Sequence, residues 1–343
     1  MQSNSNHIPV LTFFNNKGGV GKTTMVYHLS YMLGELGKRV LVVDLDPQSN
    51  LSSMFLNDEI EKFWVNDNES TILTAIRPLI RGLGDIEQAF IKNINERIGL
   101  VVGDLGLSSF EDKLSDAWIR CSDGDEAAFR IVSAFFRIIQ TTALSHKASI
   151  VLVDVGPNLG AINRSALISS DYIITPVAPD LYSVQGLKNL GPTLINWRRM
   201  WENRLQQRPD DPSLILPKGN MLPKGYIVLQ HGVRNNRPVK AYQRWANKIP
   251  IEYRNSVIAQ NNNGSILTIE NDEYCLGLLK HYQSLMPMSM EARKPIFLLK
   301  PSDGAIGAHY QAVQRSYLDL EKLAKKILEV TLNESSEIVG IDR

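Results

Sequence analysis

The amino-acid sequence alternates short, wholly apolar runs with longer segments in which apolar residues recur at helical spacing. Residues 10–14 read VLTFF and residues 39–46 read RVLVVDLD. Apolar runs of this length, rich in β-branched and aromatic residues, are typical of strands that are buried on both faces of a parallel sheet. Similar runs at 150–153 and 226–230 predict further strands.

The segment between the first two runs predicts a helix. Gly37 occupies the position of a helix C-cap, and five apolar residues precede it at helical spacing: Val26, Leu29, Met32, Leu33 and Leu36. The order of strand, glycine-rich loop, helix and strand is a βαβ unit, whose crossover we expect to be right-handed. The fold class predicted for the chain is α/β, with a doubly wound, mainly parallel sheet and helices on both faces. Residues 124–140 and about 307–330 predict packing helices.

A glycine-rich loop, NNKGGVGKTT at residues 15–24, joins the first strand to the helix. Gly18, Gly19 and Gly21 permit backbone angles and a close approach that side chains prevent. In such loops the backbone N–H groups, with those of the helix N-terminus, converge on phosphate oxygens. A glycine turn without a ligand is the alternative, which the strand and helix on either side disfavour.

The polar residues that end the loop have the chemistry of a triphosphate site. Lys22 is expected to contact the outer phosphates, the Thr23 hydroxyl to ligate Mg²⁺, and Thr24 to contact an inner phosphate. The pattern GxxxxGK[ST] has a glycine where this chain has Asn16, whereas KGGxGK[ST]T matches at every position.

The balance of charge excludes a global attraction to nucleic acid. Lys and Arg number 37 against 36 for Asp and Glu, a formal net charge of +1, so any attraction needs a local patch. Residues 234–254 are locally basic, with Tyr and Trp between the charges. Such residues bind nucleic-acid backbone and stack on bases, and they equally make a solvated helix face with its aromatics in the core. We favour the second interpretation, because no groove-entering motif is visible in the sequence.

Cysteine usage and apolar runs indicate the compartment. Cys121 and Cys275 lie far apart and form no disulfide framework, which favours a reducing environment. The first residues lack a basic flank and an apolar signal core, and no run approaches the roughly 20 residues of a membrane helix. Acidic residues in the final helix and tail disfavour anionic lipid. We expect a cytoplasmic protein that does not bind membranes.

Several segments together resemble the ParA/MinD family of deviant Walker A P-loop ATPases. Besides the loop, these are VVDLDPQSN at 42–50, IVLVDVGPNLG at 150–160, ITPVAPDLYSVQGL at 174–187 and, more weakly, KPIFLLKPSDGAIGAHYQAV at 294–313. Gly156 replaces the first proline of the family's usual DxPPxxG. The resemblance implies one P-loop ATPase domain over residues 1–343, with family-specific insertions at about 57–148 and 197–290.

The resemblance also implies a role for each residue of the site. The nucleotide would be held by the loop residues Asn16, Lys17, Gly18, Gly19, Val20, Gly21, Lys22, Thr23 and Thr24. Thr23 and Asp154 would hold Mg²⁺, the latter through water. Asp46 would orient the attacking water, while Asp44 would support Mg²⁺ or the switch, and the assignment between these two acids stays open. We also expect Asp44 and Asp46 to point to opposite sides of the strand end.

Lys17 is the lysine that distinguishes the family from other P-loop proteins. In relatives it reaches across a nucleotide-sandwich dimer and contacts the partner's phosphates, where its charge offsets charge developing on the transferred phosphoryl group. With Lys22 and Asp46 it completes the expected catalytic set. The alternative is a solvated lysine beside a loop. The implied cofactors are ATP and Mg²⁺, and the implied assembly is a homodimer in the ATP state.

Two functions of different kinds follow. The first is plasmid or chromosome partitioning, with non-specific DNA binding in the ATP state and a protein partner that stimulates hydrolysis. The second is a regulatory or scaffold ATPase that positions a partner protein, for example an effector, without DNA binding. A biosynthetic enzyme that uses ATP to activate a substrate ranks last, because the sequence reveals no substrate site.

Overall fold

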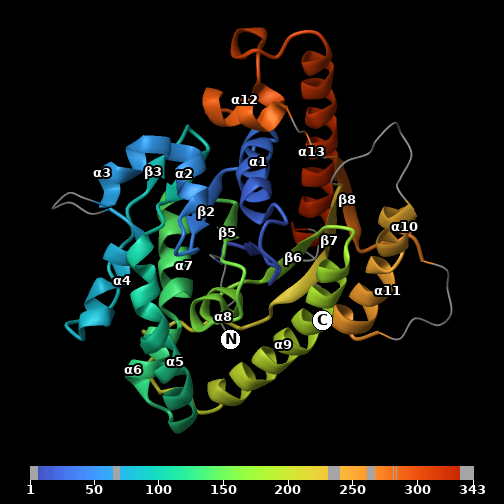
Figure 1. Ribbon diagram of the computed structural model, residues 1–343. Coiled ribbons are helices and arrows are strands. Elements are labelled where there is room, and N and C mark those ends of the chain that lie inside the picture. Colours follow the sequence, from blue (N-terminus) through green and yellow to red (C-terminus); the bar gives the residue numbers. More distant parts are fainter. Residues whose placement is uncertain are drawn as a thin grey trace, which may run out of the picture.

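The computed structural model describes residues 7–64, 70–230, 240–260, 267–280, 282 and 284–332. Their strands form one eight-stranded sheet in the order β3-β4-β2-β5-β1-β6-β7-β8 (Figure 1). Every neighbouring pair in it is parallel except β3 with β4. The strands are β1 (Val10–Phe13), β2 (Val40–Asp44), β3 (Lys92–Asn93), β4 (Ile98–Val101), β5 (Ile150–Asp154), β6 (Tyr172–Val177), β7 (Leu222–Gln230) and β8 (Cys275–Lys280).

Helices cover both faces of the sheet, as Figure 1 shows. One face carries α1 (Lys22–Glu35), α2 (Asn50–Leu56), α12 (Leu285–Ala292) and α13 (Ala308–Leu332). The other carries α4 (Ile72–Arg81), α5 (Glu111–Arg120), α6 (Glu126–Val132), α7 (Ala134–His146), α8 (Ala161–Ile168) and α9 (Leu181–Leu205). The short helices are α3 (Glu61–Trp64), α10 (Lys240–Ala246) and α11 (Ile249–Glu252). The predicted doubly wound α/β class is therefore confirmed.

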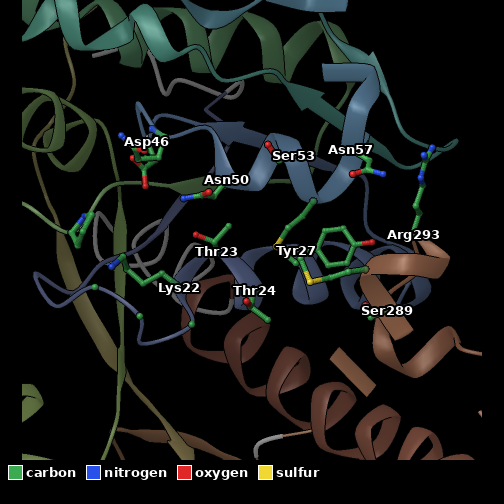
Figure 2. A pocket seen from close by; sticks show the side chains of 17 residues that line it. Lys22, Thr23, Thr24, Tyr27, Asp46, Asn50, Ser53, Asn57, Ser289 and Arg293 are labelled. Carbon is green, nitrogen blue, oxygen red and sulfur yellow. Dashed lines mark hydrogen bonds between the residues drawn. The ribbon is translucent and has the colours of Figure 1, made fainter. Parts of the chain in front are cut away.

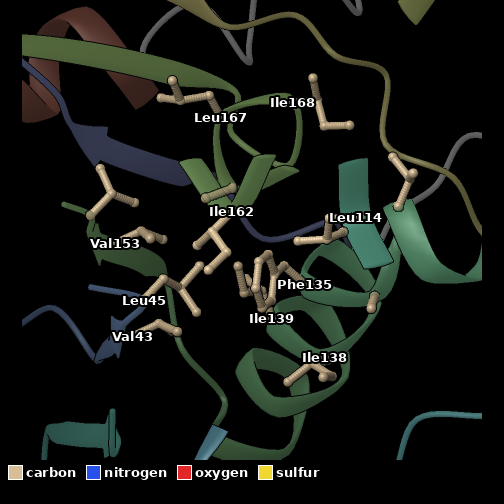
Figure 3. Close-up of a cluster of buried hydrophobic side chains, with 14 of the residues drawn as sticks. Val43, Leu45, Leu114, Phe135, Ile138, Ile139, Val153, Ile162, Leu167 and Ile168 are labelled. Atoms are coloured by element: carbon tan, nitrogen blue, oxygen red, sulfur yellow. The ribbon is translucent and has the colours of Figure 1, made fainter. Parts of the chain in front are cut away.

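The apolar runs of the sequence are strands with both faces buried. In β2, Leu41 and Val43 pack into the cluster beneath α7 and α8, part of which is drawn in Figure 3. Val40 and Val42 pack into the cluster beneath α1 and α13. Successive side chains of β2 thus enter the hydrophobic clusters on opposite faces of the sheet. A central strand buried on both faces therefore needs a continuous apolar run.

The strand predicted at 226–230 begins earlier in the structure. β7 starts at Leu222, four residues before the predicted run. Pro223 is accommodated because the register with β6 shifts: Ile173 faces Pro223, Ile174 faces Gly225, and Lys224 is the extra residue of a bulge. The boundary prediction was wrong because a bulge tolerates a proline that a regular central strand excludes.

The packing helix predicted at 124–140 is two helices. α6 and α7 meet at Ser133 with a bend of 56°. No single helix in the described part of the chain is long and apolar enough to cross a membrane, and only this bent pair passes that test jointly. Its large side chains, such as Phe129 and Phe135, are fully buried in the core. The final helix, predicted at about 307–330, is α13, and its apolar side chains pack inward.

The middle of the chain contributes to the sheet itself. β4 pairs in parallel with β2, and α7 packs against β2 and β5. The prediction that 57–148 and 197–290 are family-specific insertions stays a prediction. The basic segment 234–254 lies partly outside the described residues, which omit 231–239. Residues 261–264, whose sequence NNNG predicts a turn, lie wholly outside them. In its described part Tyr253 is fully buried, whereas Arg244 and Lys248 are exposed.

Candidate nucleotide-binding site

The glycine loop has the backbone that its sequence predicts. Gly19 and Gly21 have φ values of 71° and 78°, in the left-handed region that favours glycine. Gly21 is also the N-cap of α1. A Cβ at Gly21 would lie 2.8 Å from Leu229 Cδ1 at the end of β7, so this position is restricted by both backbone angle and space.

Lys22 lies inside the loop. Its Nζ donates hydrogen bonds to the carbonyl oxygens of Asn15 at 3.0 Å and Lys17 at 3.1 Å. Burial lowers the pKa of Lys22, and the charges of Asp154 and Asp46 oppose that shift. The ammonium therefore ties the helix start to two carbonyl oxygens of the loop and holds the loop in a curved conformation.

Two carboxylates end neighbouring strands beneath the loop. Asp44 and Asp154 are paired in register at the ends of β2 and β5, and both are fully buried. Neither oxygen of Asp154 has a well-formed hydrogen bond within the described structure, although the Thr23 hydroxyl lies close enough to lower its pKa. Burial, reinforced by the charge of Asp44, nevertheless raises the pKa of Asp154 well above its usual value.

Asp44 is better satisfied than its neighbour. It accepts hydrogen bonds from the Ser52 amide and hydroxyl, each at 2.8 Å, and from the Asp46 amide at 3.2 Å. Burial raises its pKa to about 7, the Ser52 hydrogen bonds oppose this, and the Asp46 charge adds to it. The expectation that Asp44 and Asp46 point to opposite sides was wrong, since Asp44 accepts hydrogen bonds from Ser52 of α2 and Asp46 lines a cavity bordered by α1 and α2. Residues two apart in a strand share a face.

A cavity of about 610 Å³ opens above these residues. Its lining comes from the loop, from α1 and α2, and from α12. Figure 2 shows Lys22 and Asp46 toward one end and Asn57 and Arg293 toward the other. The contribution of α2 and α12 was missed by sequence reasoning, because helices far apart in the chain give no local signal of a shared cavity.

A second cavity, of about 220 Å³, shares Gly19, Gly21 and Thr24 with the first. Its other walls are mainly apolar, with Leu229 and Leu279 from the ends of β7 and β8. His28 of α1 also lines it and is 3% exposed. Neither ring nitrogen has a well-formed hydrogen bond within the described structure, although the Thr24 backbone lies close enough to oppose the fall in its pKa. Burial lowers the pKa of His28 to about 3, so the ring is neutral at physiological pH.

The loop residues take three positions. Gly18, Gly19, Gly21, Lys22, Thr23 and Thr24 line the large cavity, as does Asp46, with Asp44 and Asp154 buried beneath it. Val20 is buried in the core. Lys17 is separate from the cavity lining and makes an ion pair with Asp180 beside the Tyr182 ring. The buried Asn16 side-chain oxygen, without a partner within the described structure, faces Gly186.

The loop after β4 was also missed. The Gly103 amide donates to Ser52 Oγ at 2.8 Å, and a Cβ at Gly103 would lie 2.9 Å from the Asp44 carboxylate. The signal that was available is the sequence VVGD at 101–104, a second apolar run that ends in glycine and an acid. This loop supports Asp44 from the side opposite Asp154.

A glycine loop between the first strand and a helix, with carboxylates at the ends of adjacent parallel strands, defines the class of P-loop nucleoside triphosphatases. The family described as AAA domain matches residues 8–207, more than half of the chain. The chain belongs to this family, among its ParA-like P-loop ATPases.

Curated relatives match a similar region. An uncharacterised protein from Methanocaldococcus jannaschii is 32% identical over 179 residues, which are 52% of this chain and 62% of the relative. Protein IncC from Escherichia coli is 30% identical over 53% of this chain and 44% of its own length. The chromosome partitioning protein ParA from Caulobacter vibrioides is 25% identical over 59% of this chain and 68% of its own. The matched region thus spans less than two thirds of the first two relatives.

Solved structures share the fold over nearly the whole chain. A protein from Corynebacterium diphtheriae has a TM-score of 0.71 at 21% identity and covers 95% of this chain and 100% of its own. A plasmid partition protein from Borrelia burgdorferi bound to AMPPNP has a TM-score of 0.59 at 18% identity, covering 94% and 99%. McdA from Cyanothece in complex with ATP has a TM-score of 0.61 at 17% identity and covers 95% of this chain and 97% of its own.

Proposed function

We propose that the protein is a cytoplasmic ParA-like switch that binds ATP with Mg²⁺, dimerises and hydrolyses the nucleotide, and that it acts in partitioning of plasmid or chromosomal DNA. The observation that carries this proposal is the convergence of Lys22 and Thr23 with Asp46 and Asp154 at the carboxyl ends of β1, β2 and β5. Ligands of open α/β sheets bind at that edge.

The loop fits a triphosphate. Its residues, from Asn16 to Thr24, would hold the phosphates through backbone N–H groups, with Lys22 as the buried cation. Thr24 lines both cavities. We therefore place the inner phosphate beside Thr24 and the base in the smaller, mainly apolar cavity.

The oxygen donors also fit Mg²⁺. Asp154 is a buried carboxylate whose oxygens lack well-formed hydrogen bonds, and the Thr23 hydroxyl is close to it. In the described part of the chain no three His, Cys, Asp or Glu residues form a closed metal site. That matches Mg²⁺, which keeps waters and phosphates among its ligands. Thr23 and Asp154 would hold the ion, with Asp44 in support, and the bound ion would neutralise phosphate charge.

Asp46 is the residue to which we assign the attacking water. It lines the cavity, is 7% exposed and accepts a hydrogen bond from the Gln48 amide at 3.0 Å. Lys22 would stabilise the phosphates in the same chain. Lys17 would act in a second subunit of an ATP-bound homodimer, where it offsets charge on the transferred phosphoryl group.

The biological setting rests on the relatives. Caulobacter ParA is a chromosome partitioning protein and the Borrelia protein is a plasmid partition protein. For this chain we propose ATP-dependent, non-specific DNA binding and a protein partner that stimulates hydrolysis. The competing function is regulation of a partner protein without DNA binding, and the DNA-retention experiment below distinguishes the two.

Calorimetry of the wild type with Mg²⁺ and ATP tests the site. We expect binding that Lys22→Ala abolishes and that Lys322→Ala, a matched change of an exposed lysine on α13, leaves intact. Light scattering of Asp46→Ala with ATP should detect a dimer. A well-folded wild type without affinity for Mg²⁺ and ATP would refute the proposal.

Retention of random duplex DNA tests the setting. We expect retention that requires ATP and weakens steeply with salt, since phosphate contacts release counterions. ATP-dependent capture of a protein partner without DNA retention would instead favour the regulatory function.

A further inference from the structure

The helix α8 has its N-terminal cap supplied from another helix. It follows the loop 155–160, and its N-cap residue, Gly160, has no side chain to accept hydrogen bonds from the first-turn amides. Glu111, the first residue of α5, takes that role. Its Oε1 accepts from the Ala161 amide at 2.5 Å and its Oε2 from the Ile162 amide at 2.9 Å. A carboxylate in this place also interacts favourably with the helix dipole.

The Glu111 cap leaves no room for a side chain at Gly160. A Cβ on Gly160 would lie 2.6 Å from Glu111 Oε1 and 3.0 Å from Asn158 Oδ1. The φ of Gly160 is −76°, which any residue adopts. Glycine is therefore required here by the approach of the Glu111 carboxylate and the Asn158 amide, and the backbone angle does not require it.

The first turn of α8 in turn holds the loop. Asn163 Nδ2 donates to the carbonyl oxygens of Gly156 at 2.8 Å and Asn158 at 2.7 Å. The loop then meets the candidate water-orienting acid, since a Cβ on Gly156 would lie 3.3 Å from Asp46 Oδ1. The position of α8 therefore sets the position of the loop against Asp46.

A second contact joins α5 to α8. The Arg164 guanidinium of α8 lies 4.4 Å from the centre of the Trp118 ring of α5. Leu114 and Ile162 belong to the same buried cluster, as Figure 3 shows. α5 therefore contacts α8 twice, through Glu111 at the first turn and through Trp118 further along the helix. These contacts hold α8, and with it the loop 155–160, in place.

We propose that Glu111 is a positioning residue for ATP hydrolysis. By capping α8 it holds the loop 155–160 in the place where Asp46 and the terminal phosphate meet the attacking water. The inference rests on the proposed function. It predicts that losing the cap slows the chemical step while leaving nucleotide affinity in place, because Glu111 is separate from the residues that line the cavities.

The test compares Glu111→Ala and Glu111→Gln with Asp112→Asn, a change of the adjacent, exposed acid in the same helical turn. We expect Glu111→Ala to lower kcat by about 10- to 100-fold, the range for a slightly misplaced catalytic geometry, with the Kd for Mg²⁺-ATP within about twofold of wild type. Glu111→Gln, which retains one acceptor oxygen, should recover part of the loss. Asp112→Asn should behave as wild type.

Gly160→Ala provides an independent route, because its methyl group displaces the Glu111 carboxylate without removing it. It should lower kcat as Glu111→Ala does, which keeps the inference testable if one variant fails to fold. A folded Glu111→Ala variant with wild-type kcat overturns the inference and leaves the proposed function standing. A wild type that binds no Mg²⁺-ATP overturns both.

Discussion

Lys17 and Asp180 form an ion pair within a single chain, although 163 positions separate them. Asp180 is at the same time the N-cap of α9 and accepts a hydrogen bond from the Ser183 amide at 2.8 Å. Burial raises the pKa of Asp180, but the hydrogen bonds from Lys17 and Ser183, together with the Lys17 charge, outweigh it and hold that pKa below its usual value. The lysine proposed to serve a second subunit is thus engaged by its own chain.

We predict that Asp180→Asn promotes the ATP-bound dimer. Asparagine preserves the helix cap but removes the charge that holds Lys17. A partly exposed ion pair is worth up to about 1 kcal/mol in each of the two subunits, so the concentration for half dimerisation should fall by up to about 30-fold. Light scattering with ATP in an Asp46→Ala background measures it, with the exposed Asp210→Asn as control. A weaker dimer would indicate that Asp180 contributes to the interface itself.

Asp154→Asn should have opposite effects on stability and binding. The nearly isosteric amide removes a buried carboxyl whose oxygens lack well-formed hydrogen bonds in the described structure. We therefore expect the unliganded protein to gain about 1–3 kcal/mol in the free energy of unfolding, while Mg²⁺ ceases to strengthen ATP binding. Denaturant unfolding and calorimetry measure the two.

Asp272→Asn is the matched contrast. Asp272 is equally buried but accepts hydrogen bonds from Tyr226 and Arg254, each at 2.7 Å. Replacing it should destabilise the protein, because Arg254 loses its buried charged partner and keeps, among the described residues, only the exposed Glu273. If both substitutions change stability in the same direction, the account of Asp154 is wrong.

His28 should make stability depend on pH below about 6.5. Its pKa falls from 6.5 in the unfolded chain to about 3 in the folded protein because the ring is buried. Only the unfolded state binds the proton between these values, so stability is fully present above pH 6.5 and is lost as pH falls toward 3, by at most about 1.4 kcal/mol per unit. His28→Asn should reduce this slope in denaturant unfolding, and an unchanged slope would contradict the assignment to His28.

Gly191 and Gly34 should respond oppositely to alanine, although both lie inside helices. A Cβ on Gly191 of α9 would lie 1.7 Å from the Ser256 carbonyl oxygen in the π-helical turn Tyr253–Ile258, whereas one on Gly34 of α1 meets Ile98 at 3.6 Å. Gly34→Ala should stabilise the protein by about 1 kcal/mol. Gly191→Ala should destabilise the protein by about 1–3 kcal/mol or more, because its methyl group overpacks the contact with Ser256. Thermal unfolding decides, and equal effects would refute the packing argument.

The sequence predicted the parts of the site that are local in the chain. The apolar run of β1, the loop with Lys22 and the helix α1 follow one another, so residue type and spacing are sufficient to place them. Asp44 and Asp154 were assigned correctly to strand ends for the same reason. Register then made them neighbours, since parallel strands end at one edge of a sheet.

What the sequence did not predict depends on long-range contacts. Glu111 gave no signal as a cap, because its partners Ala161 and Ile162 lie 50 and 51 positions away. The walls supplied by α2 and α12 and the bulge at Lys224 are likewise results of packing between distant segments. A local periodicity contains no information about such contacts until the sheet order is known.

That sheet order has a consequence for the synthesis of the chain. β1 and β2 pair with β5 and not with each other, so the centre of the sheet cannot close before residue 154 has left the ribosome. Until then the nascent chain carries two apolar strands with unpaired edges, a state prone to association with other chains. A translation arrest before β5 would therefore yield a fragment that needs chaperone protection.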